Sequence, residues 1–125
     1  MKDELLLAID PGVTSGIAIK LEKVYKTMVA SCPEEVWEFV NYCVWTRVIC
    51  ENFATAGRIS TYGLHTVRII GGIQALCWNK NIPLVLRMPQ HRYSKQKLAN
   101  ASPIPKTIHE RDALAHLLSW EASIK

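Results

Sequence analysis

Residues 5–16, LLLAIDPGVTSG, combine an apolar run, a single carboxylate and a Pro-Gly turn. The run Leu5–Ile9 is too short for a helix and aliphatic enough for a strand buried on both faces. Asp10 is therefore predicted at the carboxyl end of a central strand, at the edge of the core. A carboxylate there needs a positive partner, or it closes the turn through the amide of Gly12 or Val13. Residues 5–16 alone leave both interpretations open.

The length of 125 residues and a hydrophobic content of 49% predict one globular domain, residues 1–125. No apolar run approaches the roughly 18 residues of a membrane span, and the N-terminus lacks a signal-peptide pattern. We therefore expect no membrane partner and a cytoplasmic location. The four cysteines, Cys32, Cys43, Cys50 and Cys77, show no C-x-x-C spacing, which favours free thiols in a reducing compartment over disulfides or a zinc site.

Positive charge is concentrated in one half of the chain, although the formal net charge is only +4. Residues 1–55 carry five basic and eight acidic residues, whereas residues 57–111 contain a single acid, Glu110. The basic residues of that second segment are Arg58, Arg68, Lys80, Arg87, Arg92, Lys95, Lys97, Lys106 and Arg111. Such an asymmetry favours a contact with nucleic acid over a merely solvated face.

The first third of the chain predicts three strands followed by a helix. Residues 5–10, 16–21 and 24–30 have strand character and are joined by short turns, which indicates an antiparallel meander. Thr14 and Ser15, in the first turn, are either ordinary turn residues or hydroxyls offered to an anion or a metal-bound water. A helix is expected from Pro33, with acids in its first turn facing the positive end of the helix dipole.

The stretch 46–51, TRVICE, repeats the pattern of the first strand, because a β-branched run again ends in a carboxylate, Glu51. The intervening helix supplies the crossover that parallel pairing of the two strands requires. Asp10 and Glu51 are then predicted side by side. Two adjacent carboxylates repel each other unless a cation lies between them, so this pairing favours a metal site over a turn cap.

The rest of the chain predicts two more helices and one more strand around an irregular basic segment. Gly71 and Gly72 weaken the first of these helices and therefore indicate close approach, to the sheet or to a phosphate backbone. The expected elements are a loop over 54–62, a helix over 63–79 with Val67, Ile70, Ile73, Leu76 and Cys77 on its apolar side, an edge strand over 82–87, an irregular segment over 88–107 with a short helix around 94–98, and a helix over 108–123.

The last predicted helix begins with a histidine and an aspartate on one face. His109 and Asp112 are three residues apart, and His116 follows one turn later. Alone, such a pair is ordinarily explained by an aspartate that compensates the helix dipole and a histidine that is simply a polar residue. Together with Asp10 and Glu51, it predicts a cluster of candidate metal ligands.

These motifs resemble those of the RuvC-type Holliday junction resolvases of the ribonuclease H-like superfamily. The resemblance covers essentially the whole chain. The chain is also similar in length to the compact phage and viral members of this family. The motifs that carry it are Ile9-Asp10-Pro11-Gly12-x-x-x-Gly16, Val48-Ile49-Cys50-Glu51 and His109-x-x-Asp112-Ala113-Leu114-Ala115. The resemblance implies an α/β, ribonuclease H-like fold: a five-stranded mixed sheet in the order 3-2-1-4-5, flanked by helices.

The resemblance also implies a site and a reaction. Asp10 would bridge two Mg²⁺ or Mn²⁺ ions, Glu51 would bind one, and Asp112 and His109 would complete the set, with His109 a ligand, a general base or a neighbour of the ligands. Carboxylates suit such ions, and a pair of them supports phosphodiester hydrolysis. The implied activity is that of a DNA recombination and repair endonuclease. It would resolve four-way junctions and cut other branched DNA such as forks and flaps.

The implied partners are branched DNA and a second copy of the chain, paired through the helix over 63–79, in the host cytoplasm if the protein is phage-encoded. Two alternatives stay open: a YqgF-like RNA-processing nuclease on the same fold, and a catalytically inactive nucleic-acid-binding module. An actin-like ATPase is excluded, because that fold needs two such domains. The candidate DNA-binding residues are Phe53, Arg58, Arg87, Arg92, Lys95, Lys97 and Lys106.

Overall fold

The computed structural model describes residues 4–52 and 61–124 of the chain. The predicted order of three strands, helix, strand, helix, strand and final helix is confirmed, with two short helical elements between the last strand and the last helix. The elements are β1 (Leu5–Asp10), β2 (Ser15–Leu21), β3 (Val24–Ala30), α1 (Pro33–Asn41), β4 (Arg47–Glu51), α2 (Thr61–Lys80), β5 (Leu84–Arg87), the 3₁₀ helix η1 (Pro89–Arg92), α3 (Tyr93–Ala101) and α4 (Ile108–Ser123).

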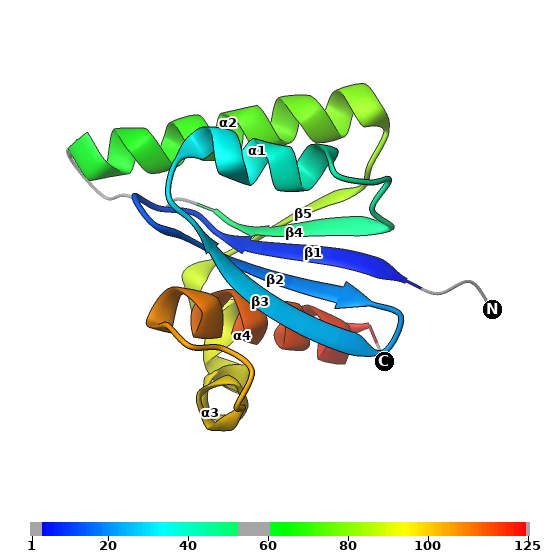
Figure 1. The fold of residues 1–125 in the computed structure, drawn as a ribbon, viewed down its shortest axis with the longest axis vertical. Helices are drawn as coiled ribbons and strands as arrows, with labels where there is room; N and C mark the ends of the chain where they lie inside the picture. Colours follow the sequence, from blue (N-terminus) through cyan, green and yellow to red (C-terminus); the bar gives the residue numbers. More distant parts are fainter. Residues whose placement is uncertain (1–3, 53–60, 125) are drawn as a thin grey trace.

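The five strands form one mixed sheet in the order β3-β2-β1-β4-β5, as the sequence predicts. β1 pairs antiparallel with β2, and β2 pairs antiparallel with β3. On its other side β1 pairs parallel with β4, and β4 pairs parallel with β5. Since α1 provides the crossover between β1 and β4, these two strands run the same way and end at the same edge of the sheet (Figure 1).

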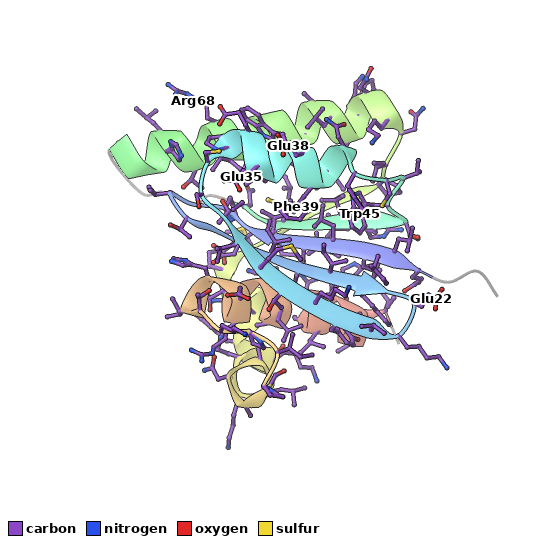
Figure 2. All side chains as sticks on the ribbon, in the orientation of Figure 1. Glu22, Glu35, Glu38, Phe39, Trp45 and Arg68 are labelled. Atoms are coloured by element: carbon purple, nitrogen blue, oxygen red, sulfur yellow. The ribbon has the colours of Figure 1, made fainter. Side chains whose placement is uncertain are left out.

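Helices cover both faces of the sheet, with α1 and α2 on one face and α3 and α4 on the other (Figure 1). β1 is buried on both sides: Leu7 and Ile9 belong to the core under α1 and α2, whereas Leu6 and Ala8 belong to the core under α4. Figure 2 shows Trp45 and its neighbours in the layer between α1 and the sheet, where its indole donates to the carbonyl oxygen of Phe39 at 2.9 Å. The continuous apolar run of residues 5–9 is explained by this double burial.

The turn after β1 is closed by Ser15. Its buried hydroxyl accepts from the Gly12 amide at 3.1 Å and donates to the Gly12 carbonyl at 3.2 Å. Ser15 is therefore an ordinary turn residue, the first of its two predicted alternatives.

The buried face of α2 is the predicted one except at Val67, which is 41% exposed. Ile70, Ile73 and Cys77 are buried, and Leu76 is partly buried against the same core. Ile69, which was not predicted on this face, is buried as well. Gly72 lies against Trp37, so α2 packs on α1 as well as against the core over the sheet.

Two glycines mark close approaches between layers. A Cβ on Gly16 of β2 would overlap the backbone carbonyl of His109, at the start of α4, and a Cβ on Gly72 would overlap the indole of Trp37. The close approach predicted from Gly71-Gly72 is thus confirmed for Gly72, with a helix as the neighbour, whereas a Cβ on Gly71 would meet nothing within 4 Å.

All four cysteines are free thiols, as expected. Within residues 4–52 and 61–124, no helix is both long and apolar enough to cross a membrane.

Gly16→Ala is predicted to destabilise the protein more than Gly72→Ala. The neighbour of Gly16 is backbone, which cannot rotate away, so we expect a loss of about 3 kcal/mol in the free energy of unfolding. At Gly72 the indole can turn, and alanine adds about 1 kcal/mol of helix propensity. Urea unfolding of both variants measures the difference, and an equal or reversed ranking contradicts the packing of α4 against β2.

Candidate active site

The ends of β1 and β4 bring two carboxylates together. Ile9 lies opposite Cys50 in the parallel register, so the next residues, Asp10 and Glu51, are neighbours at the edge of the sheet. Their proximity is also seen in the pKa of Asp10, which the negative charge of Glu51 acts to raise. The juxtaposition predicted from the two strand patterns is therefore confirmed.

A third carboxylate, Asp112, comes from the first turns of α4. The start of this helix is fixed by Thr107, whose hydroxyl accepts from the Glu110 amide at 3.2 Å and donates to the Glu110 carboxylate at 2.8 Å. Glu110 is buried and also accepts from Thr27 of β3 at 2.8 Å. Glu110 thus secures the helix to the sheet, and the negative charge of Asp112 acts to raise the pKa of Asp10.

Arg92, at the end of η1, enters this cluster as its cation. Its Nη1 donates to Oε1 of Glu51 at 2.6 Å, and its Nε lies 3.7 Å from Oδ1 of Asp112. The guanidinium therefore contacts two carboxylates that come from different elements, β4 and α4. This arrangement links the segment after β5 to both β4 and α4.

His116 of α4 is the second partner of Glu51. The ring is fully buried, and its Nε2 lies 2.8 Å from the same Oε1 that Arg92 contacts. Its other nitrogen, Nδ1, is buried and has no hydrogen-bond partner among the described residues.

The pKa values of Asp10 and Glu51 are shifted in opposite directions. Burial, together with the negative charges of Glu51 and Asp112, raises the pKa of Asp10 from 3.8 to about 8. Burial also acts to raise the pKa of Glu51, but the hydrogen bonds from His116 and Arg92 and the positive charge of Arg92 outweigh it and lower that pKa. At neutral pH Asp10 therefore holds a proton, and Glu51 is ionised.

The donor set suits a hard divalent cation in its chemistry. Asp10, Glu51 and Asp112 are oxygen ligands, and Arg92 together with a proton on Asp10 balances them. Within the part of the chain that the structure describes, however, no three His, Cys, Asp or Glu side chains converge on a common metal position. The side chain of Arg92 lies between two of the three acids, so a metal ion and this arginine compete for the same carboxylates.

The fold was compared with those of known proteins. No protein-family model and no curated protein sequence matches the chain. Among solved structures, RuvC of Thermus thermophilus in complex with a Holliday junction substrate is similar over 97% of this chain and 96% of its own, with a TM-score of 0.73 and 14% identity. The fold is that of the RuvC resolvases.

Two further structures share the RuvC fold. Another Thermus thermophilus RuvC structure is similar over 96% of both chains, with a TM-score of 0.65 and 17% identity. The fowlpox virus Holliday junction resolvase is similar over 95% of this chain and 99% of its own, with a TM-score of 0.61 and 15% identity. The predicted resemblance to RuvC-like resolvases with a ribonuclease H-like fold is confirmed at the level of structure.

Three of the four site residues predicted from the RuvC motifs belong to the cluster, and the fourth lies beside it. His109 contributes its backbone carbonyl to the contact with Gly16, and its ring makes no hydrogen bond or ion pair within residues 4–52 and 61–124. His116, which the sequence analysis placed on the same face without a role, contacts Glu51 instead. The spacing of four residues places His116 on the same helix face as Asp112, but it does not indicate the contact with Glu51.

The predicted DNA-binding residues are dispersed. Arg92 is drawn into the acidic cluster, and Arg87 donates to the hydroxyl of Ser119 at 3.1 Å. The three lysines stay on the surface around α3 and the segment after it, with Lys95 half-buried and Lys97 and Lys106 exposed. Two other candidates, Phe53 and Arg58, lie outside the described residues.

In metal-free buffer, the stability of the protein is predicted to fall as pH rises from about 4 to about 8. The pKa of Asp10 is 3.8 when unperturbed and about 8 in the fold. Between these values the unfolded chain has released the proton while the native state still binds it. The free energy of unfolding therefore falls as pH rises through this range. The expected slope reaches about 1.4 kcal/mol per pH unit.

Asp10→Asn should abolish most of this slope and raise stability at pH 8. Urea unfolding in EDTA at several pH values provides the measurement. Glu38→Gln, which removes an exposed carboxylate on α1, serves as the control and should keep the wild-type slope. A slope that survives in Asp10→Asn assigns the proton to another group.

Proposed function

We propose that this protein is a divalent-metal-dependent endonuclease that cuts branched DNA, with four-way junctions as its main substrate. The observation that carries the proposal is the placement of Asp10 beside Glu51 at the carboxyl ends of two parallel strands, with Asp112 of α4 joined to Glu51 through Arg92. The fold shared with a RuvC structure that contains a Holliday junction substrate supports the choice of substrate.

In this proposal Asp10, Glu51 and Asp112 hold two Mg²⁺ or Mn²⁺ ions, and His109 is an additional ligand or base. When bound, such a pair supplies an activated nucleophile and stabilises the leaving oxygen of a phosphodiester. The chain's own contribution is to keep the three carboxylates together on rigid elements. A metal ion held by these carboxylates would replace the proton that the raised pKa of Asp10 retains and the contacts of Arg92 with Glu51 and Asp112.

The basic segment after β5 is the proposed DNA-binding surface. Lys95 and Lys97 of α3 and Lys106 follow Arg92 in the sequence, so these candidate phosphate contacts are close along the chain to one residue of the acidic cluster. Lysines bind the DNA backbone without selecting sequence. This surface therefore fits recognition of DNA shape, as a branched substrate requires.

A dimer is the proposed assembly, and an apolar stripe on α2 supports it. Leu64, Val67 and Trp78 are 53%, 41% and 86% exposed, and a Cβ on Gly71, on the same face, would meet no described residue within 4 Å. The spacing of three, four and seven residues places them along one side of the helix. Such a stripe suits pairing with the same helix of a second copy, and a symmetric dimer fits symmetric cleavage of a four-way junction.

The activity is tested with labelled four-way junction, fork, flap and linear duplex DNA, in Mg²⁺, Mn²⁺ or EDTA. We expect paired cuts in the junction that require a metal. We expect Asp10→Asn to lower the cleavage rate by at least 10³-fold, since it removes the carboxylate proposed to touch both ions. Glu38→Gln should cleave like the wild type, because Glu38 is on α1, which covers the face of the sheet opposite to α4.

Binding measured by fluorescence anisotropy separates the alternatives. Asp10→Asn should bind the junction as tightly as the wild type, because its phosphate contacts are intact. Cleavage of RNA instead of DNA favours the YqgF-like alternative, and binding without cleavage of either favours an inactive module. Undiminished cleavage by Asp10→Asn rejects the proposed site.

Trp78→Ala is predicted to weaken the dimer at least tenfold, as measured by sedimentation equilibrium. The matched control is Tyr42→Ala, which removes an aromatic side chain that is 78% exposed but lies after α1, off the stripe. A monomeric wild type, or equal effects of both substitutions, excludes α2 as the interface.

A further inference from the structure

His116 is a buried polar residue in the apolar layer between α4 and the sheet. Its exposure is 0%, and its neighbours along the helix, Ala115 and Leu117, belong to the core under α4. An aliphatic side chain would fill this space without an unpaired nitrogen, whereas the imidazole leaves Nδ1 without a partner among the described residues. A histidine at this position is therefore best explained by the contact that its other ring nitrogen makes.

That contact is with Glu51. Nε2 of His116 lies 2.8 Å from Oε1, the same carboxylate oxygen that accepts from Nη1 of Arg92 at 2.6 Å. A carboxylate oxygen that accepts from a guanidinium is an acceptor toward its other partner as well, so the ring proton is assigned to Nε2. Nδ1 has no partner among residues 4–52 and 61–124 that would require the proton on that atom instead.

One oxygen of Glu51 thus has two partners, Arg92 and His116. They differ in how firmly the surrounding structure holds each of them. Arg92 reaches Oε1 from η1 and is about one fifth exposed, with Asp112 as an alternative partner. His116 reaches the same atom from α4, whose start is pressed against β2 at Gly16 and secured by Glu110. When Arg92 withdraws, His116 remains.

We propose that His116 is a positioning residue that fixes the orientation of the Glu51 carboxylate by donating from Nε2 to Oε1. The carboxylate then keeps one rotamer whether Arg92 is present or has been displaced by a divalent ion. The proposal deepens the metal site of the proposed function and rests on it. It concerns a residue that acts through Glu51 and does not itself bind the ion.

The test compares His116→Gln with His116→Leu. The glutamine amide nitrogen can replace Nε2 as a donor, whereas leucine fills the space without one. Binding of Mn²⁺ to the protein without DNA is measured by calorimetry. We expect 10- to 100-fold weaker binding for His116→Leu and a change of only a few-fold for His116→Gln.

Ser119→Ala is the matched control, because Ser119 is another buried polar residue of α4 that contacts Arg87 and His91 and not Glu51. It should bind Mn²⁺ like the wild type. Wild-type affinity in His116→Leu overturns the positioning role, as does equal loss in the glutamine and leucine variants. A wild type that binds no Mn²⁺ overturns the proposed function together with this inference.

A second measurement holds even where His116→Leu fails to fold. Long-range ¹H–¹⁵N correlation of the metal-free wild-type protein reports which ring nitrogen of His116 carries the proton. We expect the Nε2–H form. The Nδ1–H form overturns the proposal, because the ring then has no proton to donate to Glu51.

Discussion

The parallel pairing of β1 with β4 is the constraint on which the rest of the molecule depends. It ends two buried strands at one edge and places Asp10 beside Glu51. Two carboxylates in this position repel each other and are partly withdrawn from water, so the fold must compensate them. Arg92 and the ring of His116 both contact Glu51, and the pKa of Asp10, raised to about 8, favours the uncharged form of that carboxyl group.

The packing around the sheet explains how this costly arrangement is maintained. β1 contributes apolar side chains to both cores, so the strand that carries Asp10 is held from above and below. On one face, Gly16 allows α4 to approach until backbone meets backbone, which fixes the helix that carries Asp112 and His116. Burial of apolar surface elsewhere thus offsets the electrostatic cost at the strand ends.

The sequence was sufficient for the sheet because its signals are local. Each strand has its own apolar run, and the helix after β3 makes the pairing of β1 with β4 parallel by topology alone. The limits of the buried face of α2 were less predictable, because that helix has two apolar stripes. One contains Ile69 and Ile73, which are buried, and the other contains Val67 and Trp78, which face outward. Periodicity identifies both stripes and does not tell that Val67 belongs to the outer one.

The same distinction applies to the site. Asp10, Glu51 and Asp112 follow from strand ends and helix starts, which sequence patterns mark well. Arg92 and His116 join them through side-chain reach across 41 and 65 positions of the chain, and no local pattern encodes such contacts. The two differ in a way that matters for a site meant to admit a cation. An arginine on a short 3₁₀ helix balances charge and can leave, whereas a histidine inside a packed helix face holds its carboxylate in place. A cluster built with one exchangeable and one fixed partner keeps its geometry while its charge balance changes.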